Sequence, residues 1–408
     1  MHILIVSQTF PPATSTRAIQ IGKVVKALQE NTCRTTVIAG AGRNHSAEHL
    51  SSAQVVYLPC WRRNGHGSAL ARLSGRLKAE LYSCWSRNSW VRDAAAQATE
   101  IIEKHKPDCV MTASTPFESH LAGLAIKRKT GLPWAAYFSD PWPAAIVAPP
   151  YGPNSIPLLS AIQKSYLCKV LSICDAVIMP NKYAIKLMEE KAAVPIAAKS
   201  CVIPHIGSSI TATSDDKGNG YVAHVGHLMR ERVSKPFLEG LRLAVDTIGP
   251  SFHGLMCVGN TCPEFRSLVR RLNLDEHVEY VGSLPHEKAL KVCRGATALL
   301  VLEADMPESP FLPSKFADYV FAGRPIIAVT PAVSAIRDYL NDYGGGIPVR
   351  NVPEEISQAL ADMFSANNAV KQPIDGDMPP LAQAFSSSAV GMEYRRMFTA
   401  LLSRSNLL

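Results

Sequence analysis

Short runs of apolar, often β-branched residues recur along the chain, and most are followed by a stretch with helical periodicity. The first run is Ile3–Val6, and a loop with Pro11 and Pro12 separates it from a helical stretch that begins near Arg17. Uninterrupted apolar runs of this length indicate strands that are buried on both faces. Further strands of the first half are expected at Thr36–Ala39, Val55–Leu58, Cys109–Thr112, Trp134–Phe138 and Ala176–Met179. Such alternation predicts an α/β fold with a parallel sheet and right-handed crossovers.

A polar, glycine-bearing segment, Ser208–Gly220, interrupts this pattern, and its composition is typical of a linker. Beyond it the alternation restarts, with strands expected at Tyr221–Val225, Gly254–Val258, Val278–Val281, Ala298–Leu302, Pro325–Val329 and Ile347–Val349. We therefore predict a first domain over residues 1–207, a linker over 208–220 and a second domain over 221–380. Residues 381–408 are predicted to be helical over Ala382–Leu401 and to cross back to the first domain.

The composition agrees with two folded domains. A chain of 408 residues exceeds what one hydrophobic core usually supports, and 47% hydrophobic with 19% charged residues is typical of globular proteins. No apolar run reaches the ~18–20 residues that span a bilayer, and the first ten residues are too short and strand-like for a signal peptide. We therefore expect a cytoplasmic protein whose ten scattered cysteines are reduced core residues.

The net charge of +8 is concentrated between Trp61 and Arg92, where Leu, Tyr and Trp alternate with Arg and Lys. Two interpretations of this stretch stay open. One is a helix on an anionic membrane surface, which would place the protein at the inner face of the cell membrane. The other is a surface helix that buries its apolar stripe against its own domain. No nucleic-acid partner is expected.

Several motifs together carry a family resemblance that covers nearly the whole chain. They are the Pro11–Pro12 loop with Arg17, Ser114–Trp142, Cys174–Asn181, Val202–His205, His224–Lys235, Val278–Leu290 and Phe311–Ala328. In order and spacing the chain resembles retaining glycosyltransferases of the GT-B architecture, often called the glycosyl transferases group 1 family.

The resemblance implies a fold, an activity and a set of ligands. The implied fold is two Rossmann-like parallel-sheet domains that face each other across a cleft. The implied activity is retaining transfer of a sugar from a nucleotide-diphosphate-sugar donor, UDP- or GDP-linked, to a hydroxyl acceptor. Surface polysaccharide or lipopolysaccharide synthesis is the expected setting, with a carbohydrate or lipid-linked saccharide acceptor and no cofactor.

The predicted donor site lies in the second domain. Lys235 matches the lysine with which family members hold the diphosphate, whereas His227 stands where they often have an arginine; Arg230 or Arg232 could substitute for it. Lys235 also precedes Pro236, a good first helical residue, so the positive end of a helix dipole would lie beside its ammonium. Its loss should weaken donor binding severely.

Family members also often carry two glutamates seven residues apart, the first near the donor sugar and the second on the ribose hydroxyls. Asp318 occupies the second of these positions, Pro310 the first, and Glu308 lies two residues before Pro310. A helix beginning near Pro313 would offer unpaired amides to phosphate or sugar hydroxyls. The remaining predicted donor-site residues are Gly226, Phe311, Leu312, Ser314 and Lys315.

The predicted acceptor site lies in the first domain. Asp140 follows the strand Trp134–Phe138 and could orient or deprotonate the acceptor hydroxyl, or it could cap a turn before proline. Ser139 lies beside it, Trp142 offers a platform for a sugar ring, and Arg17 could meet phosphate or an acidic acceptor.

Two further side chains follow in the next helical stretch. His120 is a second catalytic candidate, although a lone histidine in an amphipathic helix is often structural. The spacing of Thr115 and Glu118 predicts a capping box at the start of that helix.

The sequence offers no Asp-x-Asp pair in a suitable place, since Asp215 and Asp216 lie in the linker and Asp305 stands alone. We therefore expect no bound metal and assign the charge of the departing diphosphate to cations of the protein. Two alternatives stay open. One is a nucleotide-sugar epimerase of the same fold, and the other is a noncatalytic GT-B partner protein, which the departures at His227 and Pro310 would suit.

Overall fold

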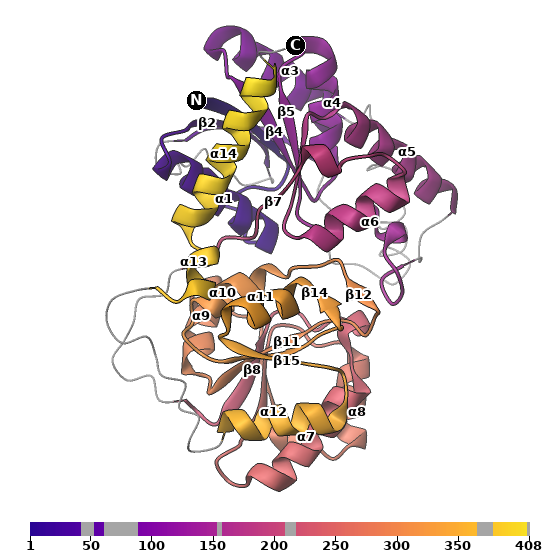
Figure 1. Ribbon diagram of the computed structural model, residues 1–408, viewed down its shortest axis with the longest axis vertical. Helices are drawn as coiled ribbons and strands as arrows, with labels where there is room; N and C mark the ends of the chain where they lie inside the picture. The colour runs from indigo at the N-terminus through magenta and orange to yellow at the C-terminus, as the bar shows by residue number, and fades with distance from the viewer. Residues whose placement is uncertain (42–52, 61–88, 153–156, 209–217, 365–377, 406–408) are drawn as a thin grey trace. The chain divides into compact units, whose positions relative to one another are not determined.

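The computed structural model describes residues 1–41, 53–60, 89–152, 157–208, 218–364 and 378–405 (Figure 1). The chain divides into two compact units. Unit 1 comprises Met1–Pro204 and Ser387–Leu408, and unit 2 comprises His205–Ser386. The two units are described one at a time below.

Unit 1 contains a parallel seven-stranded sheet in the order β3-β2-β1-β4-β5-β6-β7. Its strands are β1 (His2–Ser7), β2 (Arg34–Ala41), β3 (Gln54–Pro59), β4 (Cys109–Ser114), β5 (Trp134–Phe138), β6 (Ala176–Met179) and β7 (Ser200–Val202). Every residue of β1, β4, β5 and β6 is buried, which explains why these strands are nearly unbroken apolar runs. The six predicted strands are confirmed, and the short, partly exposed edge strand β7 was not predicted.

Helices cover both faces of this sheet. They are α1 (Thr16–Glu30), α3 (Ser89–His105), α4 (Glu118–Thr130), α5 (Pro157–Ile173), α6 (Lys182–Ala192) and α14 (Ser387–Ser405), with short 3₁₀ turns at Ala144–Ile146 and Ala197–Lys199. The last helix, α14, lies alongside α1, while α4 packs between α3 and α5 (Figure 1). The crossover through α1 and those through α3, α4 and α5 run in opposite directions along the sheet. Because all are right-handed, α1 with α14 covers one face, and α3, α4 and α5 cover the other.

The predicted capping box at Thr115 and Glu118 is wrong. Residues 115 and 116 form a bend after β4, so the helix α4 starts only at Glu118, and Phe117 at the cap position makes no side-chain cap hydrogen bond. Glu118 is buried instead, and this burial raises the pKa of its carboxyl group.

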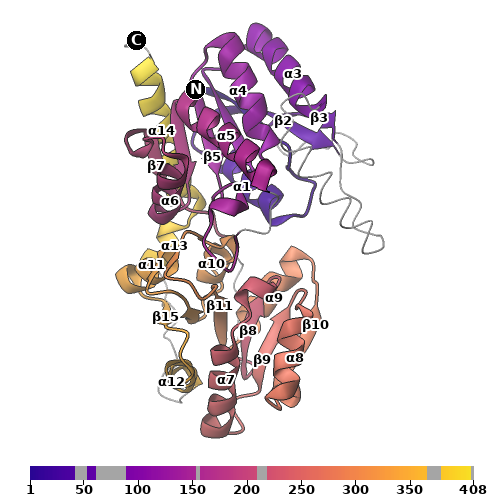
Figure 2. The ribbon, with the colours of Figure 1, turned by 90° about the vertical axis from the view of Figure 1, so that its right-hand side faces the viewer.

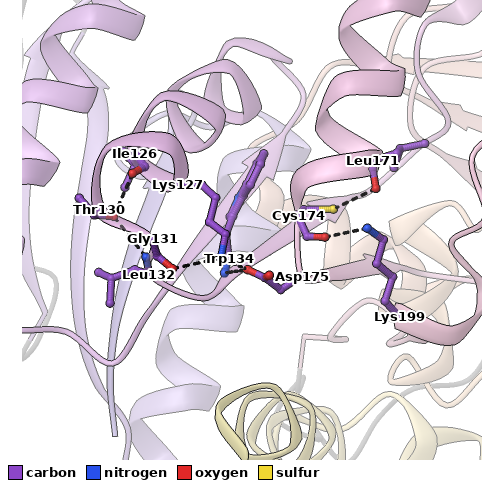
Figure 3. A network of polar contacts seen from close by, with 10 residues as sticks. All are labelled: Ile126, Lys127, Thr130, Gly131, Leu132, Trp134, Leu171, Cys174, Asp175 and Lys199. Carbon is purple, nitrogen blue, oxygen red and sulfur yellow. Dashed lines mark hydrogen bonds and ion pairs between the residues drawn. The ribbon is translucent and has the colours of Figure 1, made fainter. Parts of the chain in front are cut away.

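A polar network joins the loops that precede β5 and β6 at the amino end of the sheet (Figure 3). The Asp175 carboxylate accepts a hydrogen bond from the backbone N–H of Trp134 at 2.8 Å and pairs with the Lys127 ammonium at 2.8 Å. Lys199 donates to the carbonyl oxygen of Cys174 at 2.7 Å. These contacts hold the edge of the sheet that lies opposite the carboxyl ends of the strands.

Unit 2 contains a parallel six-stranded sheet in the order β10-β9-β8-β11-β13-β15. Its strands are β8 (Tyr221–Val225), β9 (Gly254–Val258), β10 (Val278–Gly282), β11 (Ala298–Leu302), β13 (Ile326–Val329) and β15 (Gly346–Val349). The six predicted strands are confirmed, three of them to the residue. A separate two-stranded ladder, β12 (Glu308–Ser309) with β14 (Val333–Ser334), was not predicted.

The helices of unit 2 are α7 (Lys235–Ile248), α8 (Pro263–Arg271), α9 (His286–Gly295), α10 (Ser314–Val320), α11 (Ala335–Tyr343), α12 (Pro353–Phe364) and α13 (Pro380–Ala384). Short 3₁₀ turns lie at Arg230–Arg232 and Asp275–His277. The helices α7 and α12 lie side by side (Figure 2), and the core beneath them contains Phe237, Leu241, Leu300 and Ile356. The predicted helical tail is broken at Phe385 and Ser386, between α13 in unit 2 and α14 in unit 1.

Two predicted features fall largely outside the described residues. They are the basic stretch Trp61–Arg92, of which only residues 89–92 are described, and the linker, of which residues 209–217 are not described. In the described part of the chain no helix is long and apolar enough to span a membrane. The cysteines that the structure describes are free thiols, and five of them are buried: Cys33, Cys109, Cys174, Cys257 and Cys293.

Candidate functional site

The order of the strands in unit 2 reverses between β8 and β11, and ligands of such sheets bind at the carboxyl ends of the strands beside this point. The loops after β8 and β9 approach each other closely there. Gly226 has φ 127° and Gly259 has φ 110°, which L side chains rarely adopt. A Cβ on Gly259 would lie 2.7 Å from the carbonyl oxygen of Gly226, so this contact requires glycine.

A lysine ammonium lies at this switch point, and among the described residues no carboxylate is in hydrogen-bond contact with it. Lys315, in the first turn of α10, lies with its Nζ 3.0 Å from Nε2 of His224 on β8. Burial lowers the pKa of His224 well below 6.5, so the ring is neutral and accepts a hydrogen bond from the ammonium. Burial, together with the charge of Arg232, also lowers the pKa of Lys315 well below 10.5.

The two arginines of the 3₁₀ turn at Arg230–Arg232 differ in their surroundings. Arg230 is 79% exposed and its Nε lies 3.5 Å from a carboxylate oxygen of Glu264. The charge of Arg232, in contrast, lowers the pKa values of His224 and Lys315, so its guanidinium acts on the switch point.

Lys235 begins α7 directly after Ser234, whose Oγ accepts the N–H of Phe237 at 2.9 Å and so caps the helix. Its side chain is 62% exposed, and Nζ lies 2.5 Å from Glu239 Oε1, one turn further along the helix. Lys235 therefore has a carboxylate partner, unlike Lys315. His227 is exposed, and its Nδ1 accepts the N–H of Asn260 at 3.2 Å, which joins the loops after β8 and β9.

Asp318 lies one turn beyond Ser314 on α10, and its side chain is only 13% exposed. Its Oδ1 accepts the backbone N–H of Ser208 at 2.9 Å, and its Oδ2 lies 3.9 Å from Nε2 of His286. The carboxylate thus connects Ser208 and the start of α9 to α10.

The remaining predicted donor-site residues lie in the segment that leads to α10. Glu308 is partly buried in β12, and the N–H of Phe311 donates to Ser309 Oγ at 3.3 Å. Leu312 is 1% exposed and belongs to the core, so it acts through packing.

Three residues near the switch point were missed in the sequence: His224, Glu303 and Tyr319. The Tyr319 hydroxyl accepts the N–H of Val225 at 2.7 Å, which fixes α10 to the end of β8. His224 and Glu303 are polar residues within or directly after apolar strand runs, and that position is the signal that could have revealed them.

A pocket of about 270 Å³ opens at the carboxyl ends of β11, β13 and β15 in unit 2. Its lining comprises residues 303–307, 329–332 and 350–352. The Asn351 amide on its rim donates to Asp305 at 3.4 Å and accepts from the Ser234 hydroxyl, which connects the pocket rim to the start of α7.

In unit 1 the predicted acceptor-site residues Arg17 and Asp140 come together. Arg17 Nη2 lies 2.5 Å from Asp140 Oδ2, and their side chains are 23% and 40% exposed. Ser139 is buried and donates to the carbonyl oxygen of Ser114 at 2.7 Å, so it fixes the end of β5 to the end of β4. Trp142 stacks on Phe117, with ring centroids 3.6 Å apart and planes 8° apart.

His120 is fully buried in unit 1. Its Nδ1 lies 2.7 Å from the Thr112 hydroxyl, which itself accepts the indole N–H of Trp134 at 2.8 Å. Burial lowers the pKa of His120 to about 3, and its ring lies against Phe117 and Phe138. This geometry favours the structural alternative for His120 over the catalytic one.

Among the residues that the structure describes, no group of three or more His, Cys, Asp or Glu side chains could hold a metal ion.

No protein-family model matches the chain, and no curated protein matches its sequence. Solved structures do match it. HepE from Anabaena, determined in complex with UDP and glucose, has a TM-score of 0.65 at 12% identity, with 98% of this chain and 99% of HepE covered. The lipopolysaccharide outer core galactosyltransferase WaaB has a TM-score of 0.59 at 14% identity, covering 98% and 99%. The UDP-GlcNAc 2-epimerase from Methanocaldococcus jannaschii has a TM-score of 0.50 at 12% identity, covering 98% and 100%.

The chain has a GT-B-like fold. The similarity spans the full length of these proteins, and the two parallel sheets with their helices agree with it. At such low identity the likeness concerns the fold, which both transferases and an epimerase share.

Proposed function

We propose that this protein is a glycosyltransferase that moves a sugar from a nucleotide-diphosphate-sugar donor to a hydroxyl acceptor. The observation that carries the proposal is the ammonium of Lys315 at the switch point of unit 2. Its hydrogen-bond partner is a neutral histidine, and burial together with the charge of Arg232 lowers its pKa more than Glu303 and the nearby cysteines raise it.

A cation held in such surroundings is costly unless an anion joins it. A diphosphate would supply two negative charges at the end of β8, where Gly226 lets a ligand approach the backbone. The start of α7 adds the positive end of its helix dipole, although Ser234 already caps the N–H of Phe237 and Pro236 has no N–H. Lys315, Arg232 and this helix start would then stabilise the charge that develops as the diphosphate departs.

In the proposed reaction, the bond between the anomeric carbon of the sugar and the diphosphate oxygen breaks. The acceptor oxygen forms the new bond to that carbon, and its proton leaves to a base. Asp140 in unit 1, a half-exposed carboxylate, is the candidate that orients or deprotonates the acceptor. Transfer with retention follows from the family resemblance alone.

The setting of the reaction is part of the proposal. HepE binds UDP, and WaaB is a lipopolysaccharide galactosyltransferase, so we propose a UDP- or GDP-linked donor and an acceptor in surface polysaccharide or lipopolysaccharide synthesis. We also propose that the acceptor is lipid-linked and that the sugar is transferred to it at the inner face of the cell membrane. This part rests on the basic stretch Trp61–Arg92.

A thermal-shift screen with UDP, GDP, ADP and CMP and their common sugar conjugates tests the donor assignment. A ligand that binds only the folded protein adds to its free energy of unfolding, by about 2.7 kcal/mol at a concentration of 100 times Kd, and so raises the melting temperature. We expect one diphosphate nucleoside to raise the melting temperature of the wild type, and to raise that of K315A clearly less at the same concentration. No shift with any nucleotide would favour the noncatalytic partner protein.

Turnover of the donor that binds then separates the two enzyme alternatives. A transferase consumes donor quickly only when an acceptor is added. Conversion of the donor at the same rate without acceptor would favour the epimerase, which the structural similarity to the UDP-GlcNAc 2-epimerase keeps as a second candidate.

A further inference from the structure

One buried carboxylate connects three loops at the carboxyl edge of the sheet in unit 2. Glu303 follows β11 directly and is 7% exposed. Its Oε1 accepts a hydrogen bond from the Ser309 hydroxyl at 2.5 Å, and its Oε2 accepts one from the Thr330 hydroxyl. The three residues come from the end of β11, the short strand β12 and the end of β13.

Each of these hydrogen bonds is the last member of a chain. On one side the N–H of Phe311 donates to Ser309 Oγ, which donates to Glu303. On the other side the N–H of Arg337 donates to Ser334 Oγ at 3.1 Å, and Ser334 Oγ lies 2.6 Å from Thr330 Oγ1. When the hydroxyl of Thr330 donates to an ionised Glu303, the hydroxyl of Ser334 is the donor to Thr330.

An ionised carboxylate only accepts hydrogen bonds, so in that state Glu303 takes up the protons of both the Ser309 and the Thr330 hydroxyls. The same contacts join β12 to β14, whose pairing places Ser309 opposite Ser334. This network fixes the segment from Ala304 to Pro313, which carries Glu308 and Phe311 and leads directly into Lys315.

The ionised form has a cost. Burial raises the pKa of Glu303 above 4.5, and the hydrogen bonds and Arg232 counter this only in part. The folded protein thus holds this proton to higher pH than the unfolded chain, and ionisation at neutral pH reduces the stability of the fold. Conformational stability alone does not explain a carboxylate in this place.

We propose that Glu303 is a positioning residue that sets the segment 304–313, and through it Lys315, in the geometry that binds the donor diphosphate. This role rests on the proposed function of the switch point. It differs from the donor contacts considered above because Glu303 would act through Ser309 and not by touching the nucleotide.

E303Q tests the role, since glutamine has the same size but cannot accept both hydroxyl protons. We expect the affinity for the nucleoside diphosphate that binds the wild type to fall about tenfold, a typical loss for one charge-assisted hydrogen bond. The melting temperature should stay within about 3 °C of the wild type, because removal of the buried charge offsets the lost hydrogen bond. S309A should give a similar loss, and E303Q/S309A no more than either single variant, because both cut the same chain.

E354Q on α12 is the matched control, since it makes the same substitution at an exposed position of the same unit. Donor affinity in E354Q should equal that of the wild type. Equal affinity in E303Q and the wild type would overturn the positioning role.

Hydrogen exchange without ligand makes the test independent of the proposed function. Amides of residues 304–313 should exchange faster in E303Q than in the wild type and in E354Q, while those of β8 and β9 stay unchanged. Unchanged exchange in this segment would overturn the role even if no nucleotide binds. Faster exchange in a protein that binds no nucleotide would instead count against the donor site alone.

Discussion

The cations at the two candidate sites have opposite surroundings. In unit 1 the guanidinium of Arg17 pairs with the carboxylate of Asp140 at 2.5 Å. In unit 2 the ammonium of Lys315 faces the neutral ring of His224 and the charge of Arg232. A compensated pair suits a neutral ligand such as a sugar hydroxyl, whereas an uncompensated cation suits an anion. The difference assigns the donor diphosphate to unit 2 and the acceptor to unit 1 in our proposal.

The largest expected effect comes from D140N. If Asp140 orients or deprotonates the acceptor hydroxyl, kcat should fall about 100-fold, the lower range for general base catalysis. Donor affinity should change less than about twofold, because Asp140 belongs to unit 1 and the proposed donor site to unit 2. Steady-state kinetics and nucleotide titration measure the two quantities.

D175N is the control for D140N. Asp175 is also a partly buried carboxylate of unit 1 in an ion pair, in its case with Lys127, but it lies at the amino end of the sheet. Its loss should lower the melting temperature by a few degrees and leave kcat unchanged. If D140N instead behaved like D175N, Asp140 would only cap the turn before Pro141.

K315A should weaken binding of the nucleoside diphosphate about 30-fold, or about 2 kcal/mol, as expected for a charge-assisted contact to phosphate. K235A should cost less than about threefold, because Lys235 is exposed and already pairs with Glu239. Isothermal titration of both variants compares them directly. The reverse order would restore Lys235 as the main diphosphate ligand and remove the basis of the proposed function.

The smallest expected effect is a dependence of donor affinity on pH. The pKa of Lys315 is well below 10.5, so the ammonium loses its proton at lower pH than an exposed lysine does. Since the charged form binds the diphosphate, affinity should fall several-fold as the pH rises from 7 to about 9.5. K315R, whose guanidinium stays charged, should show a flatter profile, and an equal slope in both proteins would contradict a titrating Lys315.

Most of the fold could be predicted, since each sheet has the six strands that the apolar runs indicate. The elements that were missed, β7, β12 and β14, have two or three residues, too few for any periodic pattern. The capping box failed for a different reason. Thr115 and Glu118 have the right spacing, but a bend after β4 places the start of α4 beyond the threonine.

The sequence could predict which part of each domain holds a candidate site, but not the contacts that its side chains make. Arg17 and Asp140, 123 positions apart, were both placed at the carboxyl edge of the first sheet, and the structure joins them. His120, however, is buried against Phe117 and Phe138. Every residue from Glu118 to Leu124 is buried, polar ones included, so the pattern of this helix does not mark one core-facing side.

The sequence by itself determined the strand and helix alternation, because burial on both faces of a parallel sheet requires apolar runs and the crossovers require helices. It also placed glycines at the ends of β8 and β9. Only the tertiary structure decided that Lys315 lies against His224. Lys235 meets Glu239 within one helix, whereas Lys315 meets His224 across 91 positions, through crossovers that bring α10 beside β8. The environment of a charge depends on such distant neighbours, and local pattern does not contain them.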